Sequence, residues 1–531
     1  MGTEIMRNIK ANLLLSFSMY LALVVNGFAY AEEHTQVVTT SHGKVIGKIE
    51  DGLSVFRGLR YAAPPTGTNR FKPPQPLTPW DDVYEAFDFN HAAMQTPTAS
   101  ALPSETHSED CLYLHLWTKG VDNKKRPVMV WLHGGGYWEG APGRPVYYGH
   151  NIVQQDVVIV TVTHRLNVFG FTQLPDSWGP AYKSSGMAGM LDIVSALEWV
   201  QNNIAAFGGD PDNVTIFGES GGGAKVSMLM NMPAAEGLFH KAIIQSGAVM
   251  DANTNEFGQA LGQALLDTLG VETGNIEQLS KISADLIFTS QGKALEKVKE
   301  IAPKQAFAGN FSPTVDGLGL PTFPFSGKPS AFISAVPLMI GTNKHEATFF
   351  PFLASLKDDT KADFEKRISE LYPDKATEVA SAYYASYPDY TPGDLSFQLQ
   401  TNEIFWNNTI RVADIKSTQQ APVYLYRFDW ESQTVRNGVQ LKATHAVDVP
   451  IIFGTYESLR GFVGPGNGPE LMMKQMLPTW VAFAKSGDPN NASIPEWPVY
   501  NTSTRQTMLF NLKSEVVSDP ASAVRKAVIT P

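Results

Sequence analysis

One stretch in the middle of the chain has the residue types and spacing for nucleophilic catalysis. Ser220 lies between Gly218 and Gly222, after the β-branched and aromatic run 214–217 and before the helix-like run 224–230. A Gly-x-Ser-x-Gly pattern between a strand and a helix indicates a turn so sharp that only hydrogen side chains fit two residues on either side of the serine. The turn lifts the serine hydroxyl out of the sheet, in front of a helix N-terminus. The alternative is a glycine-rich loop that happens to contain a serine.

A second glycine-rich segment predicts the hydrogen-bond donors that a reaction at this serine would need. His133 and three successive glycines follow the apolar run 127–132 directly. Three glycines in a row leave backbone N–H groups uncovered, which suits them to bind an oxyanion. A flexible turn is the alternative, but a turn rarely needs three glycines in a row. Because the loop precedes a Gly-x-Ser-x-Gly turn, we predict an oxyanion hole formed by the N–H groups of Gly135, Gly136 and Gly221.

The general base follows by elimination among the histidines. In a doubly wound hydrolase the catalytic residues occur in the order serine, acid, histidine, so the base lies after Ser220. His240 precedes a strand and so lies at the wrong edge of the sheet, and His345 leaves little room for an acid before it. His445 lies in a loop late in the chain. We therefore expect His445 to be the base.

The acid must come from a loop between the serine and that histidine. Glu346 follows the strand-like run 336–340 at its carboxyl end, whereas Asp316 lies in a segment rich in proline and glycine. We therefore expect Glu346 to be the acid. A surface glutamate and a loop histidine are each common, but their joint occurrence in the required order favours a catalytic triad.

Residues just beyond the glycine loop are candidates for the substrate cleft. Tyr137 and Trp138 lie so close to the predicted donors that we expect their rings to form a wall of the cleft. Arg144, in the same loop, could bind a substrate carboxylate; alternatively it is solvated or pairs with Glu139. Further pocket walls are expected in the stretches 248–305 and 349–394.

Strand and helix signals alternate along the chain and so predict an α/β fold. The strands are expected in apolar runs without polar alternation, which suits strands covered on both faces: 127–132, 157–162, 214–217, 242–246, 336–340 and 422–426. Apolar residues at helical spacing predict an amphipathic helix over 190–204. We expect a large, mostly parallel sheet with helices on both faces, long insertions, and ligands at the carboxyl ends of its strands.

The first residues have the features of a secretory signal peptide. Arg7 and Lys10 precede the apolar run 11–25, and the small-x-small sequence 29–31 predicts cleavage after Ala31. The apolar run is shorter than a bilayer-spanning helix needs, so an uncleaved membrane anchor is the less favoured alternative. We expect a secreted or periplasmic protein, with a signal peptide over 1–31 and one hydrolase domain over 32–531.

Composition narrows the chemistry further. The formal net charge is −11, which disfavours nucleic acid and anionic membrane surfaces as partners. Cys111 is the only cysteine, so no intramolecular disulfide forms, and its position at the start of a strand-like run favours a packed thiol over a nucleophile. The histidines show no metal-ligand spacing. No metal or cofactor is predicted.

Ordered motifs along the chain resemble those of the type B carboxylesterases, the α/β-hydrolase family that includes bacterial esterases, carboxylesterases, cholinesterases and bile-salt-activated lipases. The resemblance runs from Gly43 to about Phe510, through motifs at 56–65, 108–114, 133–136, 164–170, 207–211, 217–223, 245–247, 343–346, 445–454 and 483–489. It implies hydrolysis of a small-molecule ester through an acyl-enzyme, with Ser220, Glu346 and His445 as the triad and Gly135, Gly136 and Gly221 as oxyanion donors.

The chain also departs from the family pattern. Many relatives have alanine where this chain has Gly221, and the family's usual cysteine partner for Cys111 is missing. The loop 87–107 also lacks the tryptophan with which cholinesterases hold a quaternary ammonium, so a choline ester is not expected. An amidase or peptidase would use the same residues. A binding protein on an inactive scaffold would lack a triad member, and none is missing.

Overall fold

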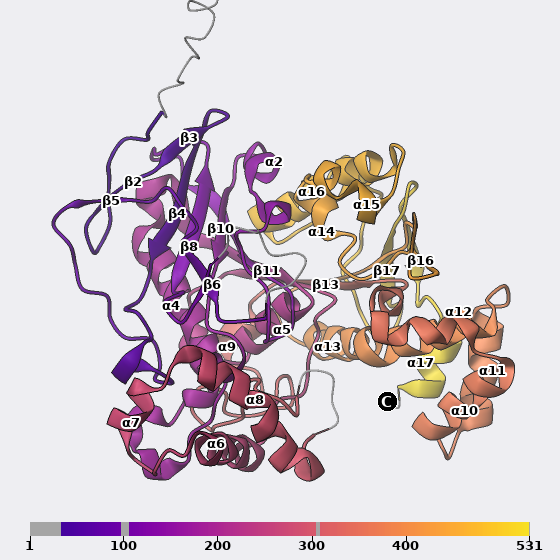
Figure 1. Ribbon diagram of the computed structural model, residues 1–531. Coiled ribbons are helices and arrows are strands. Elements are labelled where there is room, and N and C mark those ends of the chain that lie inside the picture. Colours follow the sequence, from indigo (N-terminus) through magenta and orange to yellow (C-terminus); the bar gives the residue numbers. More distant parts are fainter. Residues whose placement is uncertain (1–32, 97–105, 304–307, 530–531) are drawn as a thin grey trace, which may run out of the picture.

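The computed structural model describes residues 33–96, 106–303 and 308–529. The predicted signal peptide therefore lies outside the described residues. An 11-stranded sheet runs through the centre of the molecule (Figure 1). In spatial order its strands are β18 (Glu515–Ser518), β17 (Gln506–Phe510), β14 (Val423–Phe428), β13 (Leu338–Asn343), β12 (Lys241–Gln245), β11 (Gly209–Glu219), β9 (Arg126–Leu132), β10 (Val158–Val162), β8 (Tyr113–Thr118), β4 (Leu53–Arg60) and β3 (Lys48–Glu50).

The strand directions confirm the predicted α/β class. From β17 to β10 neighbouring strands pair in parallel. Only the edges are antiparallel, with β18 on one side and β8, β4 and β3 on the other. Each of the six predicted apolar runs overlaps a strand of this sheet, although some of their ends differ from the strand ends by one to three residues. The carboxyl ends of the parallel strands therefore meet at one edge, where ligands are expected.

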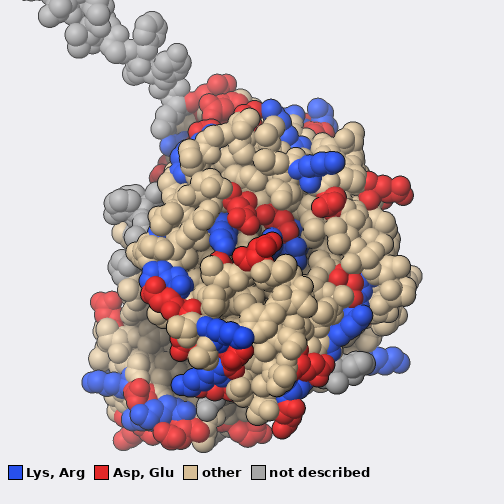
Figure 2. Space-filling view, turned by 90° about the vertical axis from the view of Figure 1, so that its right-hand side faces the viewer, with Lys and Arg blue, Asp and Glu red and all other residues tan. Residues whose placement is uncertain are grey.

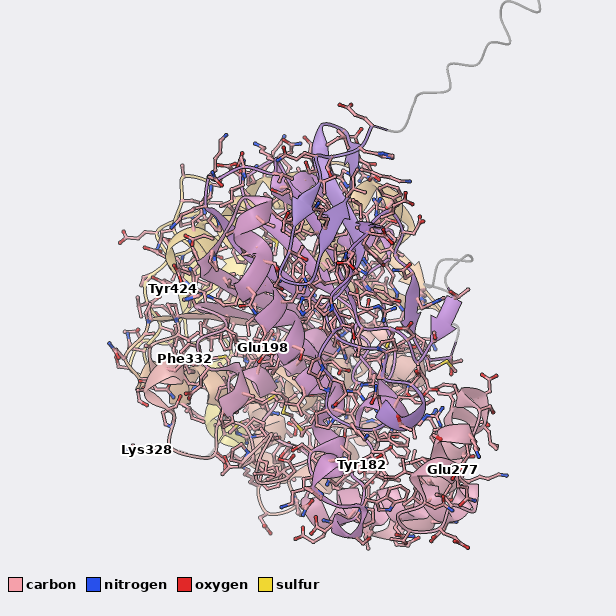
Figure 3. The ribbon with its side chains drawn as sticks, turned by 90° about the vertical axis from the view of Figure 1, so that its left-hand side faces the viewer. Tyr182, Glu198, Glu277, Lys328, Phe332 and Tyr424 are labelled. Atoms are coloured by element: carbon pink, nitrogen blue, oxygen red, sulfur yellow. The ribbon has the colours of Figure 1, made fainter. Side chains whose placement is uncertain are left out.

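Side-chain alternation in the strands shows why both faces of the sheet are covered. In β9, Val128 and Val130 belong to one apolar cluster, and Met129 belongs to another on the opposite face. α4 (Ala188–Asn203) packs in the first cluster and α16 (Gly468–Ser486) in the second. Figure 3 views the molecule from the side of α4, where exposed Glu198 lies near the middle of the view. Continuous apolar strands thus become the middle of a three-layer core.

Two helical insertions lie at the same end of the molecule. The first, between β12 and β13, contains α6 (Asn255–Leu269), α7 (Ile276–Lys281), α8 (Ala284–Val298) and α9 (Ala331–Ser334). The second, between β13 and β14, contains α10 (Lys361–Leu371), α11 (Ala376–Ser386), α12 (Pro392–Thr401) and α13 (Asn407–Ser417). Figure 1 shows both groups in its lower half. They supply walls of the cavity described below.

The surface and the helices bear on possible partners. On the face shown in Figure 2, basic and acidic side chains are intermixed, with no extended basic patch of the kind that binds nucleic acid. No helix among the described residues has the length and apolar character to cross a bilayer.

Candidate active site

The serine motif forms the sharp strand–turn–helix that its glycines predict. β11 ends one residue before Ser220, and α5 (Gly221–Leu229) begins one residue after it. Ser220 has φ of 57° and ψ of −123°, a strained conformation for a residue with a Cβ. Its N–H donates to the Gln245 carbonyl at 2.9 Å. A Cβ on Gly222 would collide with the Leu132 carbonyl, so glycine is needed at this position.

The structure brings the predicted acid and base together. His445 Nδ1 lies 2.6 Å from Glu346 Oε2, although the two residues come from loops after different strands. Both are buried, at 3% and 0% exposure. The other carboxylate oxygen of Glu346 accepts the Asn343 N–H at 2.7 Å. This contact fixes the carboxylate and, through it, the orientation of the imidazole.

A second carboxylate, which sequence reasoning missed, lies on the other side of the imidazole. Glu219 Oε1 is 3.2 Å from His445 Nε2, and its side chain is buried. Ser220 Oγ makes no hydrogen bond to His445 in the described part of the chain. A carboxylate directly before the serine, at the carboxyl end of a strand, is the signal that could have revealed Glu219.

The two carboxylates govern the titration of the histidine. Burial alone would lower the pKa of His445, but the charges of Glu219 and Glu346 outweigh burial and raise it. Burial raises the pKa of Glu219, against the opposing attraction of His445. Glu219 and His445 therefore take up protons as one coupled pair.

A buried polar network holds the histidine loop from behind. Asp448 accepts hydrogen bonds from Gln245 Nε2 at 2.8 Å and Asn343 Nδ2 at 3.1 Å. Trp480 Nε1 donates to Gln245 Oε1 at 3.0 Å. Burial raises the pKa of Asp448. These bonds tie the loop of His445 to the ends of β12 and β13.

The glycine loop after β9 reaches the start of α5. Gly135 and Gly136 have φ of 92° and 64°, values that residues with a side chain rarely adopt. A Cβ on Gly221 would collide with the backbone N and O of Gly136, so the loop and the helix are in direct backbone contact. The three predicted donors thus lie together beside Ser220.

Ser220 and His445 line one cavity of about 960 Å³. The aromatic residues in its walls include Trp138, Phe288, Phe349, Phe350, Phe352 and Phe405. Three of these rings surround the imidazole of His445, with centroid distances of 5.5 Å for Phe349, 5.2 Å for Phe350 and 4.9 Å for Phe405. The stretches 248–305 and 349–394 contribute walls, as predicted, and Phe405 extends them.

The predicted cleft residues separate into two groups. Trp138 and Arg144 line the cavity, and Arg144 is a hydrogen-bond partner of Tyr147, whose pKa is raised by burial. The expectation for Tyr137 is wrong. Its side chain is 0% exposed and packs edge-on against Phe171 at 5.2 Å, in the core rather than on the cavity wall. The two rings contact each other edge-on, with centroids 6.5 Å apart, but only Trp138 lines the cavity.

The rejected candidates lie outside the cavity. His240 lies directly before β12 and its Nδ1 accepts the Val214 N–H of β11, and His345 Nε2 lies 2.8 Å from the Tyr390 hydroxyl. Cys111 is 1% exposed, and burial raises the pKa of its thiol well above the usual range, as expected for a packed residue. No described group of three or more His, Cys, Asp or Glu side chains could hold a metal ion.

The chain and its fold match a family of ester hydrolases. Residues 34–527 match the model of the Carboxylesterase family, so the chain belongs to that family. Its structural neighbours are carboxylesterases with the α/β-hydrolase fold. The chain is therefore a carboxylic ester hydrolase.

Individual relatives match over almost their whole length. The para-nitrobenzyl esterase of Bacillus subtilis is 35% identical, with 92% of this chain and 98% of the relative covered. Pig (Sus scrofa) liver carboxylesterase is 32% identical, with 88% of each covered. A crystal structure of a Geobacillus stearothermophilus carboxylesterase superposes with a TM-score of 0.81 at 36% identity, covering 92% of this chain and 99% of the other.

Proposed function

We propose that this ester hydrolase acts by acyl transfer to Ser220, with His445 as general base and Glu346 as the group that orients it. The observation that carries the proposal is the 2.6 Å contact between His445 Nδ1 and Glu346, behind a cavity that Ser220 and His445 share. A carboxylate on Nδ1 leaves Nε2 as the nitrogen that accepts a proton. To reach the serine proton, the imidazole exchanges its contact with Glu219 for one with Ser220.

The reaction then runs in two halves. His445 takes the Ser220 proton, the serine oxygen attacks the ester carbonyl, and the N–H groups of Gly135, Gly136 and Gly221 bind the oxyanion. As the intermediate collapses, the imidazolium protonates the departing alcohol. A water, deprotonated by the same histidine, hydrolyses the acyl-enzyme and releases the acid.

Replacement of the serine tests this mechanism. Ser220→Ala should abolish ester hydrolysis and change the free energy of unfolding by less than about 1 kcal/mol, because a half-exposed hydroxyl packs little. A fluorophosphonate should add to the peptide that contains Ser220 in the wild type and not in the variant. Retention of a tenth of the wild-type activity, or labelling at another serine, would exclude Ser220 as the nucleophile.

The cavity walls support a proposal for the substrate. We propose esters with an aromatic or bulky apolar group, because a tryptophan and five phenylalanine side chains line the cavity. Two relatives act on, or are named for, esters of this kind: the para-nitrobenzyl esterase, and an esterase from anaerobic Clostridium hathewayi that can hydrolyse aliphatic aromatic polyesters. The structure of the Clostridium esterase is 30% identical with a TM-score of 0.78, and 94% of this chain and 100% of that chain are covered.

Two comparisons of substrates test this preference. Benzyl esters should have a higher kcat/KM than alkyl esters of equal chain length, because a benzyl ring packs against the aromatic walls. Equal values for the two series would reject the aromatic preference. An ester and the amide of one acid, assayed together, separate esterase from amidase activity.

Arg144 adds a possible preference within that class. We propose that it binds a carboxylate on the substrate, since it lines the cavity together with Trp138. Arg144 also contacts Tyr147, which holds the guanidinium in place at the wall.

We also propose that the protein is exported, with residues 1–31 as a signal peptide and 32–531 as the mature hydrolase domain. The support is the charged start, the short apolar run and the small-x-small sequence that ends at Ala31. N-terminal sequencing of the mature protein from the periplasm or medium should begin at Glu32. A mature chain that begins at Met1 would exclude cleavage.

A further inference from the structure

A buried lysine that the proposed mechanism does not use lies behind the oxyanion loop. Lys225 belongs to α5 and is 0% exposed. Its Nζ donates a hydrogen bond to the backbone carbonyl of His133 at 2.9 Å. Burial lowers its pKa to about 7, which reflects the cost of placing an ammonium group in the interior. Lysines are rarely fully buried, so the burial of Lys225 requires a structural or functional explanation.

The acceptor of this bond is the first residue of the loop that carries two of the three proposed donors. His133 follows β9 directly and precedes Gly134, Gly135 and Gly136. Glycines have wide conformational freedom, so this loop needs contacts from outside to hold its N–H groups in one orientation. Oxyanion donors are effective only when they are oriented before the charge develops.

The other end of the loop is held in a similar way. Gly140 donates its N–H to Gln95 Oε1 at 2.8 Å, and Gln95 Nε2 donates to the Gly140 carbonyl at 2.9 Å. Gln95 is 4% exposed. Buried side chains therefore hydrogen-bond to the backbone on both sides of Gly135 and Gly136. Lys225 makes the hydrogen bond nearer to β9.

The helix α5 carries both Lys225 and the third proposed donor, Gly221. Gly221 is the first residue of α5, and Lys225 lies four residues later, about one turn along the same face. The same rigid element thus carries the Gly221 N–H and the amine that holds the loop with the other two. An amine donates a hydrogen bond whether charged or neutral, so the contact persists across its titration.

We propose that Lys225 is a positioning residue for the oxyanion hole: by holding the His133 carbonyl, it sets the N–H groups of Gly135 and Gly136 against that of Gly221. This inference rests on the proposed catalytic function of Ser220 and these glycines. It assigns Lys225 no contact with the substrate.

The test compares two buried lysines with the same chemistry. Lys225→Met removes the donor and keeps an unbranched apolar side chain that is only one atom shorter. Lys416→Met is the matched control, because Lys416 is also 0% exposed and donates to a backbone carbonyl, that of Ile333, at 2.7 Å, but lies on α13 and lines no part of the cavity. Both variants are assayed per active site after titration with a fluorophosphonate.

We expect Lys225→Met to lower kcat about 10- to 100-fold and to change KM less than about threefold, because losing a whole oxyanion donor costs about 100- to 1000-fold. Lys416→Met should lower the melting temperature and keep kcat. The affinities of two inhibitors add a measurement that a general loss of protein stability would not change selectively. Affinity for a trifluoromethyl ketone, which forms an oxyanion on the serine, should fall with kcat, while affinity for the methyl ketone of the same shape should stay unchanged.

Several results would overturn the inference. They are a kcat for Lys225→Met within twofold of wild type, equal losses in both lysine variants, or equal weakening of both ketones. If Lys225→Met does not fold, Lys225→Gln and Lys416→Gln replace the pair, and Lys225→Gln should show a smaller kcat loss because it retains a shorter donor. Ser220→Ala distinguishes failure of the proposed mechanism from failure of the role of Lys225. If Ser220→Ala is active, the proposed mechanism is rejected. If Ser220→Ala is inactive and Lys225→Met is unimpaired, only the role of Lys225 is rejected.

Discussion

Replacing Glu219 by glutamine tests how the site controls its base. In the proposed mechanism the neutral imidazole of His445 accepts the serine proton, so activity should fall as pH drops through the pKa of His445. The carboxylates of Glu219 and Glu346 raise that pKa by stabilising the imidazolium. Glu219→Gln keeps the shape of the side chain and removes one negative charge. The pKa of His445 should therefore fall, and the acidic limb of kcat/KM should move to lower pH.

The size of the shift follows from the contact. Unit charges 3.2 Å apart attract by about 5 kcal/mol at an effective dielectric constant of about 20. Burial opposes both charges, and a raised pKa of Glu219 means that its carboxyl is itself partly protonated. These effects cancel much of the attraction. We expect a net downward shift of about 1 to 2 pH units, equivalent to about 1.4 to 2.7 kcal/mol.

The assay is kcat/KM of an ester without ionisable groups, measured from pH 5 to 10. Glu139→Gln serves as the control, because Glu139 lines the same cavity but is exposed to solvent, which screens its charge. Its acidic limb should coincide with that of the wild type. Coincident limbs for Glu219→Gln and wild type, or a shift to higher pH in Glu219→Gln, would refute the electrostatic reasoning.

Three further substitutions probe other contacts. Gly221→Ala should lower kcat about 10-fold or more with KM nearly unchanged, because the new Cβ collides with the Gly136 backbone and displaces an oxyanion donor; an unchanged kcat would contradict this packing. Arg144→Ala should lower kcat/KM about 10-fold or more for esters that carry a carboxylate and leave neutral esters unaffected; equal effects on both classes would remove it from the substrate site. Asp192→Asn should cost about 3 to 5 kcal/mol of unfolding free energy in urea, because it leaves buried Arg165 without its ion pair at 2.6 Å. Glu277→Gln is the control: Glu277, labelled in Figure 3, forms an exposed ion pair with Lys281, and its replacement should cost less than about 1 kcal/mol.

Features that depend on neighbours in sequence were predictable. The strands follow from apolar runs, and the turn at Ser220 follows from glycines two residues to either side. The choice of Glu346 and His445 needed one long-range rule, the chain order of a doubly wound hydrolase. The structure places their side chains 2.6 Å apart, because the carboxyl ends of parallel strands meet at one edge of the sheet.

Features that depend on side-chain direction were not predictable in the same way. Tyr137 and Trp138 are adjacent in sequence, yet one packs in the core and the other faces the cavity. Lys225 lies among small and apolar residues of a short helix, where a lysine would be expected to reach solvent, but the oxyanion loop covers it. The direction of each of these side chains depends on how distant segments pack against it. The hydrophobic pattern of the sequence does not predict that packing.

The buried charged groups of this site connect its stability with its catalytic power. Glu219, Lys225, Glu346 and Asp448 are each at most 3% exposed and lie within a few residues of the serine, the base or the acid. Burying each group disfavours its charged form, so the fold retains them only with specific partners, such as the His133 carbonyl for Lys225 and the Asn343 N–H for Glu346. The same partners hold each group in one orientation before the substrate arrives. In the proposed mechanism, charge that develops on the oxyanion and the imidazole then meets dipoles that need no reorganisation, which is the main source of electrostatic catalysis.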